Sequence, residues 1–319
     1  MAGGGSGSTL PAGRKATLAA FLQELRATRR ATWGNPFGYL FIAPALILYL
    51  IFNVWPIIRG FLMAFTDYRF LYPETRWAFN GLANFQEMVN DKDFWFSLGI
   101  SIRYSLMVIP TVIVLSLFLA VIISRVRHLT AFYRWVVYLP TILPIAVTFL
   151  MWKEFYDPRF GFINANLKLL GIHPLPKWLG STKTALPCIA AADVWRSIGF
   201  PTLLFLIGIY NINRELYEAA AIDGANAWQQ FWQITIPLLR PTFMLVLVLN
   251  SAILGATEQV MIMTGGGPQK ATLTIGLYLY NIAFTYGDLR LGYAAAISLV
   301  LGLISAGFSA FWFKVLREE

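Results

Sequence analysis

Six long apolar runs dominate this sequence and decide what the chain can fold into. Each run is near or above the roughly 20 residues that a helix needs to cross about 30 Å of hydrocarbon. The runs lie near residues 37–65, 97–124, 131–154, 185–212, 239–263 and 291–315. Because backbone polar groups inside a bilayer must be hydrogen-bonded within the protein, helices are the expected form. The sequence therefore predicts an all-α membrane protein with six transmembrane helices.

Composition supports this class and argues against others. Of the 319 residues, 57% are hydrophobic and 13% are charged, which is too apolar for a soluble domain of this size. The 25 Lys and Arg residues, against 16 acidic ones, are scattered or flank apolar runs, as is typical of membrane-surface contacts and not of nucleic-acid binding. The lone Cys188 permits no disulfide within the chain, and the isolated His128 and His173 indicate no metal site.

The distribution of positive charge predicts the orientation of the spans, because cytoplasmic segments close to spans are enriched in Lys and Arg. The first span is preceded by Arg14, Lys15, Arg26, Arg29 and Arg30, and the second loop carries Arg125, Arg127 and Arg134 without an acidic residue. These sides are predicted to be cytoplasmic, and an even number of spans then places both termini there. The third loop disagrees, because its five basic residues fall on the predicted outer side beside two acidic ones.

Prolines inside the runs predict broken or kinked helices, because each one frees a backbone carbonyl. They are Pro44, Pro56, Pro110, Pro140, Pro144 and Pro201. Two predicted outer loops have a composition of their own: loop 66–96 is rich in aromatic residues, and loop 155–184 carries several prolines and Trp178. Tyr and Trp favour the membrane interface. Alternatively, these loops cap a pore and meet an extracytoplasmic binding protein.

A polar stretch, Glu218–Pro241, separates the fourth and fifth runs and is predicted to fold into two short helices. Residues 215–222 are good helix formers, and Gly224 is placed to end that helix in a left-handed conformation. A second helix is predicted over 227–235, ending before Pro237 and Pro241. The small side chains between and within these helices leave a low surface that another protein can approach closely. We therefore expect a docking surface here.

The order of residues in this stretch resembles the EAA signature of permease subunits of ATP-binding-cassette importers. The matching residues are Glu218-Ala219-Ala220, Asp223-Gly224-Ala225, Phe231, Ile234, Pro237 and Pro241. Upstream Trp195-Arg196 and Gly199-Phe200, and downstream Thr264 to Pro268, resemble the carbohydrate-uptake branch, with its MalF-like and glycerol-phosphate-type permeases. The resemblance extends from about Pro36 to the C-terminus. It departs at Asn213, where relatives usually carry proline.

The resemblance implies the type I importer permease fold over residues 36–319, with the EAA loop at 213–241 forming a cytoplasmic coupling helix seated in a cleft of a separate ATPase subunit. The residues implied in coupling are Glu218, Ala219, Ala220, Asp223, Gly224, Ala225 and Phe231. A second homologous permease, an ATPase dimer and an extracytoplasmic solute-binding protein are the implied partners, in a bacterial or archaeal plasma membrane. This chain is expected to bind no cofactor and to be no enzyme, since ATP and Mg belong to the ATPase.

Residues 1–35 are predicted to form a cytoplasmic tail. Its first 15 residues are rich in Gly and Ser and are expected to be disordered. Residues 17–32 have apolar positions at helical spacing beside arginines, which fits either a short amphipathic helix on the membrane face or a frayed basic tail.

Polar groups at membrane depth are the candidates for a solute path, because they are costly unless they face water or a partner. The candidates are Asp193, Trp195 and Arg196 on the fourth span and Asn250, Thr257, Glu258 and Gln259 on the fifth. Asp193 and Arg196 share a helix face, and mutual neutralisation is the alternative to a role in the solute path. Seven residues separate Asn250 from Thr257, so a continuous helix would place both on one face. Fixed polar groups beside an aromatic plane are typical of sugar binding.

The leading hypothesis is a permease subunit for a sugar, and three alternatives stay open. A glycerol-phosphate importer would use Arg103 or Arg196 for its anion. A secondary carrier would use Glu258 or Asp193 as a proton site, but it has no use for an EAA loop. A membrane-embedded enzyme lacks clustered nucleophiles, bases or metal ligands, and Gly265–Thr272 lacks the spacing of a phosphate-binding loop. That glycine-rich stretch more plainly ends the fifth span.

Overall fold

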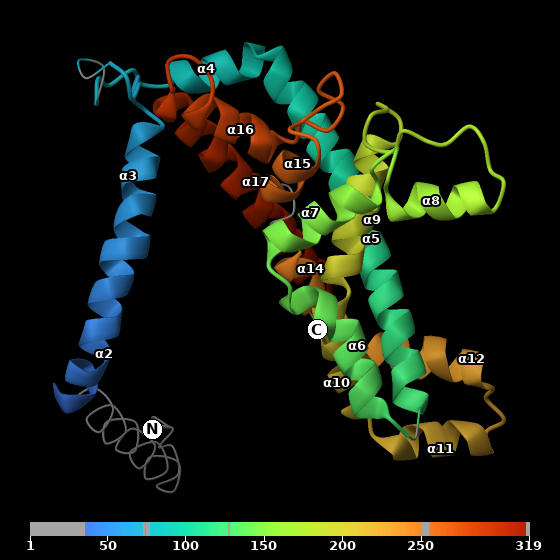
Figure 1. Ribbon diagram of the computed structural model, residues 1–319. Coiled ribbons are helices and arrows are strands. Elements are labelled where there is room, and N and C mark those ends of the chain that lie inside the picture. Colours follow the sequence, from blue (N-terminus) through green and yellow to red (C-terminus); the bar gives the residue numbers. More distant parts are fainter. Residues whose placement is uncertain (1–35, 73, 75–76, 127, 251–254, 317–319) are drawn as a thin grey trace, which may run out of the picture. The chain divides into compact units, whose positions relative to one another are not determined.

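The computed structural model describes residues 36–316, apart from 73, 75–76, 127 and 251–254 (Figure 1). The predicted tail 1–35, with its possible helix over 17–32, lies outside the described residues. The described chain is helical and adds two isolated bridges, Thr66 to Phe79 and Arg69 to Arg290. It divides into two compact units, residues 1–60 and 61–319, which are described separately.

The first unit contains most of the first apolar run, which forms a continuous helix that ends at Met63, just inside the second unit. α2 (Pro36–Tyr49) passes through a single π-helical segment, η1 (Leu50–Val54), into α3 (Trp55–Met63). The π turn lies directly before Pro56, which has no N–H to donate to the carbonyl four residues earlier. Residues 39–63 are long and apolar enough to cross a membrane, which confirms the first predicted span.

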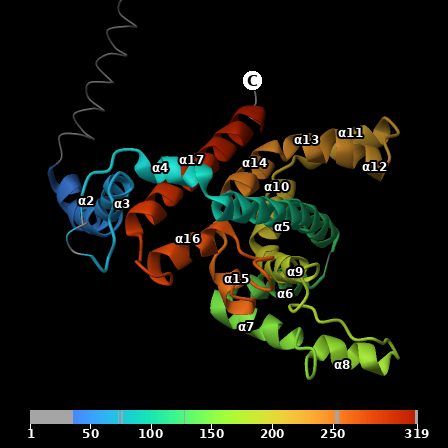
Figure 2. The ribbon, with the colours of Figure 1, turned by 90° about the horizontal axis from the view of Figure 1, so that it is seen from above.

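Two other helices of spanning length lie in the second unit. They are α5 (Lys92–Arg125) and α17 (Leu291–Leu316). The short α4 (Ala83–Asn90) runs into α5 through Asp91, whose carboxylate caps α5 by accepting from the N–H groups of Asp93 and Phe94. Figure 2 shows α5 in the middle of this unit, where it packs against α9, α10 and α16.

Two predicted spans are bent instead of straight. The third divides into α6 (Thr130–Ile142) and α7 (Ile145–Phe155), which meet at 94° across Leu143 and Pro144. The fourth divides into α9 (Ala185–Ser197) and α10 (Gly199–Tyr210), with a bend of 45°. Both breaks lie at or just before a proline, as expected from the missing N–H. Among the described residues, three helices can cross a membrane by length and composition, or up to six if each bent pair is one span.

The region after α10 departs most from the prediction. α11 (Arg214–Ile222) and α12 (Ala227–Gln230) form as expected, but the second helix does not end before Pro237: it continues through η3 (Phe231–Thr235) and α13 (Ile236–Leu238). A π turn again precedes the proline and absorbs its missing N–H. A bend of 61° then leads into α14 (Arg240–Leu249).

The predicted fifth span, 239–263, is not one helix. α14 ends at Leu249, and α15 (Glu258–Met263) begins only after Thr257. The buried α16 (Ile275–Phe284), which the sequence did not reveal, follows the glycine-rich turn. This helix of ten residues is apolar but too short to cross a bilayer, so a search for apolar runs of spanning length does not find it. The expected helix stop at this turn is confirmed, with Gly265 and Gly266 in left-handed conformations.

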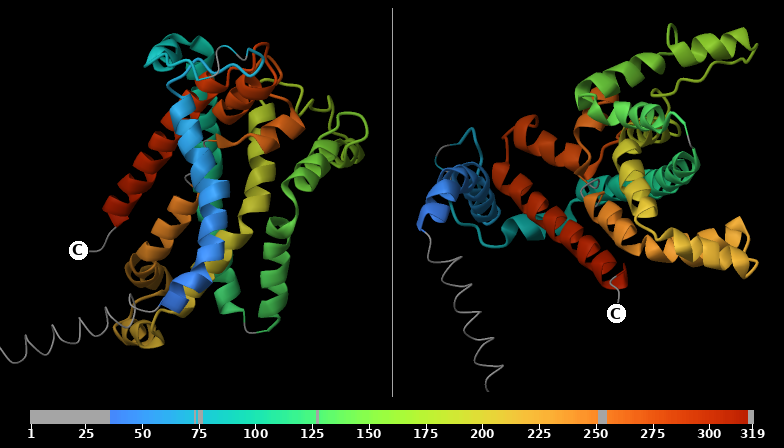
Figure 3. Two further views of the ribbon diagram at one scale, coloured as in Figure 1. Left: turned by 90° about the vertical axis from the view of Figure 1, so that its left-hand side faces the viewer. Right: turned by 90° about the horizontal axis from the view of Figure 1, so that it is seen from below.

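Two clusters of buried side chains hold the second unit together. The larger joins α5, α7, α9, α15, α16 and α17, with Tyr104, Phe149, Ile189, Ile275 and Ile297 fully buried. The smaller lies toward α11 and α12 and contains Ala120, Ile123, Phe205, Leu206, Leu239 and Val246. The left view in Figure 3 shows α11 and α12 at one end of this unit and α4 at the other.

Candidate functional site

The segment from Asn213 to Leu238, here called the α11–α13 segment, is shaped by bonds between near neighbours. The side chain of Asn213 caps α11 by accepting from the Glu215 N–H at 3.1 Å. At the other end Gly224 has a φ of +81°, the Gly224 N–H donates to the Ala221 carbonyl, and the Ala225 N–H donates to that of Ala220. This pair of bonds is a Schellman motif, so the predicted role of Gly224 in ending the helix is confirmed.

A second set of bonds holds α12 against α11. The Asn226 side chain accepts from the N–H of Gln229, and the Asn226 N–H donates to the Gln229 side-chain oxygen, which completes a capping box. The Gln230 amide donates to the carbonyls of Tyr217 and Ala225, and the Tyr217 hydroxyl lies 2.8 Å from that of Thr235. The segment therefore has one defined shape.

The seven residues predicted for coupling lie on this segment, and one of them, Phe231, lines a cavity against the ends of α5 and α10 and not the outer surface. Glu218, Ala219, Asp223 and Gly224 are exposed, and Ala220, Ala225 and Phe231 are half-buried. Ile222 and Trp228 beside them leave most of their apolar surface uncovered. Glu218 pairs with Arg214 one turn earlier at 3.1 Å. An exposed apolar patch with a charged rim is typical of a protein–protein contact.

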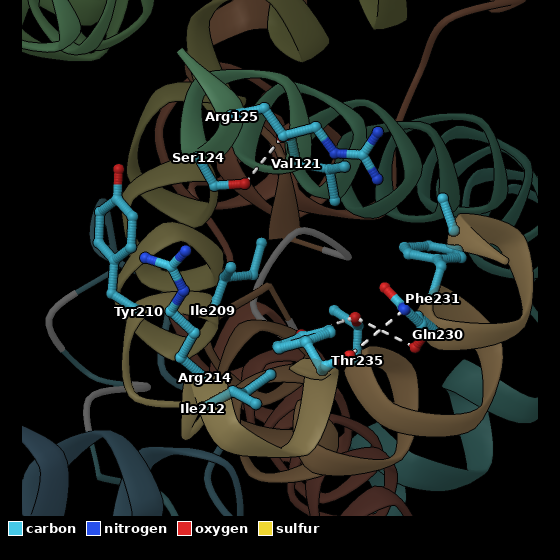
Figure 4. Close-up of a pocket in the computed structure, with 12 residues that line it drawn as sticks. Val121, Ser124, Arg125, Ile209, Tyr210, Ile212, Arg214, Gln230, Phe231 and Thr235 are labelled. Carbon is cyan, nitrogen blue, oxygen red and sulfur yellow. Dashed lines mark hydrogen bonds between the residues drawn. The ribbon is translucent and has the colours of Figure 1, made fainter. Parts of the chain in front are cut away.

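The α11–α13 segment joins the bundle through a short connection and a cavity. Only residues 211–213 separate α10 from α11, and the Asn211 N–H still donates to the carbonyls of Ile207 and Gly208. A cavity of about 610 Å³ lies between the ends of α5 and α10 and the segment itself. Figure 4 shows Arg125 and Ser124 on the α5 side of this cavity, facing Gln230 and Phe231.

A second polar group, here called the Asp193 cluster, lies inside the bundle. The Asp193 side chain is 2% exposed and accepts from the Tyr104 hydroxyl at 2.7 Å, the Gln259 amide at 3.3 Å and the Ser197 hydroxyl at 3.2 Å. The Nε of Arg196 lies 3.6 Å from the same carboxylate. The predicted pairing of Asp193 with Arg196 is therefore confirmed, but α5 and α15 supply further partners.

The backbone at the bend between α9 and α10 is also held by hydroxyl groups. Thr141 donates to the Arg196 carbonyl at 2.9 Å, and Ser116 donates to that of Ile198 at 3.0 Å. A Cβ on Gly199 would lie 2.5 Å from the Thr141 hydroxyl oxygen and 2.7 Å from the Val137 carbonyl oxygen, so only glycine lets α6 approach this closely. The bend is thus fixed by α5 and α6 next to the Asp193 cluster.

The remaining predicted solute-path residues are spread over the neighbourhood. Trp195 is half-buried and packs edge-on against Trp152, with ring centres 5.7 Å apart. Glu258 is exposed at the start of α15, and the Thr257 hydroxyl donates to the Gly255 carbonyl at 2.8 Å. Asn250 ends α14, where its amide donates to the Val246 carbonyl.

The expected shared face of Asn250 and Thr257 is wrong, because no single helix contains both residues. The sequence did not reveal Tyr104, because a neutral hydroxyl in an apolar run does not stand out, although here it is the partner of a buried carboxylate.

Asp91 and its tyrosine partners tie the helices together at the opposite end of the unit. Its carboxylate accepts from the hydroxyls of Tyr278 on α16 and Tyr293 on α17 as well as capping α5. Burial alone would raise the pKa of Asp91, but these hydroxyls and the N–H groups of Phe94 and Asp93 outweigh it and leave that pKa lowered. Arg290 pairs with Glu87 nearby through two bonds of 2.6 Å, which raises the pKa of Arg290.

Comparison with known families gives this architecture its context. The sequence profile of the family described as "Binding-protein-dependent transport system inner membrane component" matches residues 106–316. The chain belongs to this family. The predicted family resemblance is thereby confirmed, and the chain is a multi-pass membrane protein of the permease type.

Several relatives resemble this permease over most of its length. It is 33% identical over 282 residues to the trehalose/maltose transport system permease protein MalF of Thermococcus litoralis, covering 88% of this chain and 93% of that one. It is 36% identical over 296 residues to the probable ABC transporter permease protein YesP of Bacillus subtilis, covering 91% and 93%. It is 33% identical over 287 residues to the sn-glycerol-3-phosphate transport system permease protein UgpA of Agrobacterium fabrum, covering 88% and 94%.

A solved structure confirms the type of fold for this permease. A chain of a bacterial ABC transporter involved in the import of the acidic polysaccharide alginate superposes with a TM-score of 0.75 at 24% identity, covering 92% of this chain and 98% of that one. Another structure of an alginate ABC transporter, in complex with a periplasmic protein that carries an alginate pentasaccharide, aligns equally well. The predicted type I permease fold is therefore confirmed.

Proposed function

We propose that this permease carries a sugar across the membrane, that an extracytoplasmic binding protein delivers the sugar, and that ATP hydrolysis on a separate subunit drives the transport. The α11–α13 segment carries the proposal. Its shape is fixed by its own caps, and its outer surface combines small side chains with the exposed Ile222 and Trp228. Such a surface suits a cleft in another protein, and a permease of this family needs an ATPase partner.

In the proposed assembly the chain pairs with a second homologous permease, and each permease seats its α11–α13 segment on one ATPase subunit. ATP and Mg are bound by the ATPase and not by this chain. The α11–α13 segment, the loop between α5 and α6 and both termini then face the cytoplasm. The basic residues Arg125 and Arg134 near this end agree with that orientation.

The route from the α11–α13 segment to the solute runs through α10 and the Asp193 cluster. Closure of the ATPase dimer moves α11, and the short connection passes that movement to α10, which packs against α5 and α6. The bend between α9 and α10 lies next to Asp193, which contacts Gln259 on α15. Rocking of one helix group against another is a common way to alternate access.

The sugar is proposed to meet the polar groups around α15. Glu258 is exposed there and is free to accept hydrogen bonds from hydroxyl groups, whereas both oxygens of Asp193 are already engaged within the protein. The half-buried aromatic side chain of Trp195, next to Arg196 in sequence, offers a face for the apolar C–H side of a sugar ring. Asp193 therefore positions the site, and Glu258 is the proposed contact.

Uptake by the reconstituted transporter with Glu258 variants tests this proposal. Glu258→Gln keeps the size and an accepting oxygen and should retain partial uptake, whereas Glu258→Leu should abolish uptake while the complex assembles and hydrolyses ATP. Glu154→Leu, at another exposed carboxylate, is the matched control and should transport normally. Normal uptake by Glu258→Leu would remove Glu258 from the solute path, and loss of assembly would instead indicate a packing role.

The class of solute is tested separately, because relatives include both sugar and sn-glycerol-3-phosphate permeases. Arg196 is already compensated by Asp193 at 3.6 Å, whereas Arg103 is exposed on α5 and is the better anion partner for a phosphate ester. Thermal-shift measurements on the cognate binding protein with a panel of sugars and glycerol-3-phosphate decide between them. Stabilisation by a sugar and not by the phosphate ester is the expected result.

A further inference from the structure

Residues 156–184 form a projecting element, here called the α8 arm, which consists of α8 (Phe162–Leu169) and the chain on either side of it. The buried Asn164 holds the arm together. Its amide donates to the carbonyls of Pro158 and Pro176, and its oxygen accepts from the Trp178 indole N–H at 2.8 Å. The arm is therefore a fixed structure and not a loose loop.

The face of α8 that points away from Asn164 carries large apolar side chains. Phe162 and Leu169 are seven residues apart and so share one face of the helix. Phe160 is 89% exposed and Leu169 is 86% exposed, and Phe162 and Leu170 are also mostly uncovered. The polar Asn166 on this face returns its amide to the Phe162 carbonyl at 2.7 Å. The exposed surface of this face is therefore mostly apolar, and the amide N–H of its one polar side chain is bonded within the helix.

The direction of the arm relates this face to the bilayer. Figure 1 shows α8 running across the direction of α5 and α9 and projecting away from them, and Figure 2 shows the same projection from above. The neighbouring α7 exposes Val147 and Leu150, as a lipid-facing helix does. The rings of Phe155 and Phe162 lie 5.8 Å apart, so the apolar surface continues from α7 to α8. A helix that runs across the direction of the spans and exposes an apolar face suits a position along the membrane surface.

The charge around the arm is strongly biased. Between residues 153 and 184 the basic residues are Lys153, Arg159, Lys168, Lys177 and Lys183, and the acidic ones are Glu154 and Asp157. All five basic side chains are exposed. Asp157 is engaged within the arm, because it accepts from the N–H groups of Arg159 and Phe160, which lowers its pKa. The net charge of residues 153–184 is therefore positive.

We propose that the α8 arm is a membrane-interface anchor. It inserts Phe160, Phe162, Leu169 and Leu170 among the headgroups and upper acyl chains of anionic phospholipids, and its Lys and Arg side chains extend to the phosphates. The basic third loop, which disagrees with the positive-charge distribution of the other loops, is then explained by lipid contact instead of orientation. This inference does not depend on which solute the permease carries.

Fluorescence quenching by lipids tests the anchor in the complete transporter. With Cys188→Ala as background, Phe162→Cys and Leu169→Cys are labelled, in separate proteins, with a polarity-sensitive dye and placed in nanodiscs of phosphatidylcholine and phosphatidylglycerol. We expect blue-shifted emission and several-fold stronger quenching by lipids spin-labelled near the headgroup than by aqueous iodide. Strong iodide quenching without lipid quenching would overturn the proposal. Shielding that appears only after addition of the binding protein would also overturn it and assign the face to that protein.

A separate experiment tests the contribution of the basic side chains. In the labelled Leu169→Cys protein, Arg159→Gln with Lys168→Gln should remove most of the increase in lipid quenching that phosphatidylglycerol produces over pure phosphatidylcholine. Lys314→Gln, at the far end of α17, is the matched control and should leave that increase unchanged. An unchanged increase in the Arg159 and Lys168 variant would show that the basic side chains do not contact anionic lipid.

Discussion

The α11–α13 segment obtains its caps and its helix stop from residues two to five positions away, whereas Asp193 obtains hydrogen bonds from Tyr104 and Gln259, 89 and 66 residues away. The first region is exposed, so water can replace a lost bond. The second is buried at membrane depth, where nothing replaces it. The difference predicts that equal chemical changes have unequal costs in the two regions.

The largest effect is expected from Asp193→Leu. It leaves the Tyr104 hydroxyl and the Gln259 amide without their acceptor and the Arg196 guanidinium without its counter-charge, and breaking a buried pair in this way costs about 3–5 kcal/mol. Thermal and denaturant unfolding of the purified chain in detergent measure the loss. Asp193→Asn should cost less because it keeps an accepting oxygen. Wild-type stability in Asp193→Leu would show that the cluster contributes nothing and would break the comparison.

Gly224→Val should have the next largest effect. A β-branched residue at a φ of +81° costs about 1–3 kcal/mol of strain, and no atom lies within 4 Å of the added Cβ, so the cost comes from the backbone. Co-purification of the ATPase with the permease should fall several-fold. Gly224→Asn is the control, because Asn tolerates the left-handed region. Equal losses in both variants would indicate that the added side chain obstructs docking.

Asp91 combines both modes, since it caps its own helix and also binds Tyr278 and Tyr293. Because the pKa of this carboxyl is lowered in the folded protein, its contribution is complete above the ordinary pKa of 3.8 and is lost as pH falls through the lowered value. Asp91→Asn should cost about 1 kcal/mol at pH 7. Unfolding measured along an acid series should show the two proteins converging, and a gap that stays constant with pH would contradict this account.

Asn226→Ala should cost about 1 kcal/mol, because it removes the side-chain oxygen that accepts from the N–H groups of Trp228 and Gln229 at the start of α12. Asn226→Ser keeps a capping oxygen and should recover most of that loss. Hydrogen exchange of the amides of Trp228 and Gln229 is the local measurement. Unchanged protection in Asn226→Ala would show that packing by η3, and not the cap, holds this helix.

Glu218→Ala should have the smallest effect on stability, about 0.3–0.5 kcal/mol, because its pair with Arg214 is exposed. In the proposed assembly the same variant weakens the stimulation of ATP hydrolysis by solute. Glu215→Ala, on the same helix, is the control. If solute stimulates ATP hydrolysis in both variants as strongly as in the wild type, Glu218 is only a solvated helix residue.

The same contrast explains what the sequence could predict. The left-handed Gly224, the helix before it, the start of the helix after it and the helix stop at Gly265 follow from local backbone preferences, and these predictions are confirmed. The first span is also confirmed, because a long apolar run needs no further context. Asp193 and Arg196 could be paired from their spacing alone.

Other features depend on contacts that a local pattern does not contain. Prolines marked the risk of a break, but α6 and α7 bend by 94° at Pro144 while α5 continues through Pro110. The extension past Pro237 required a π turn, and α16 is an apolar helix that the bundle buries without its crossing the membrane. The roles of the α11–α13 segment in coupling and of Glu258 in solute contact stay predictions.

The three residues between α10 and α11 limit how the machine can be built. A fully extended connection of this length reaches only about 10 Å, and Asn211 and Asn213 are already bound to the helix ends on either side. In the proposed cycle the connection is rigid, so that the displacement passed on to α10 equals the displacement of α11. Insertion of flexible residues here would uncouple the movements of α11 and α10. ATP would still be hydrolysed, but each ATP hydrolysed would move less solute.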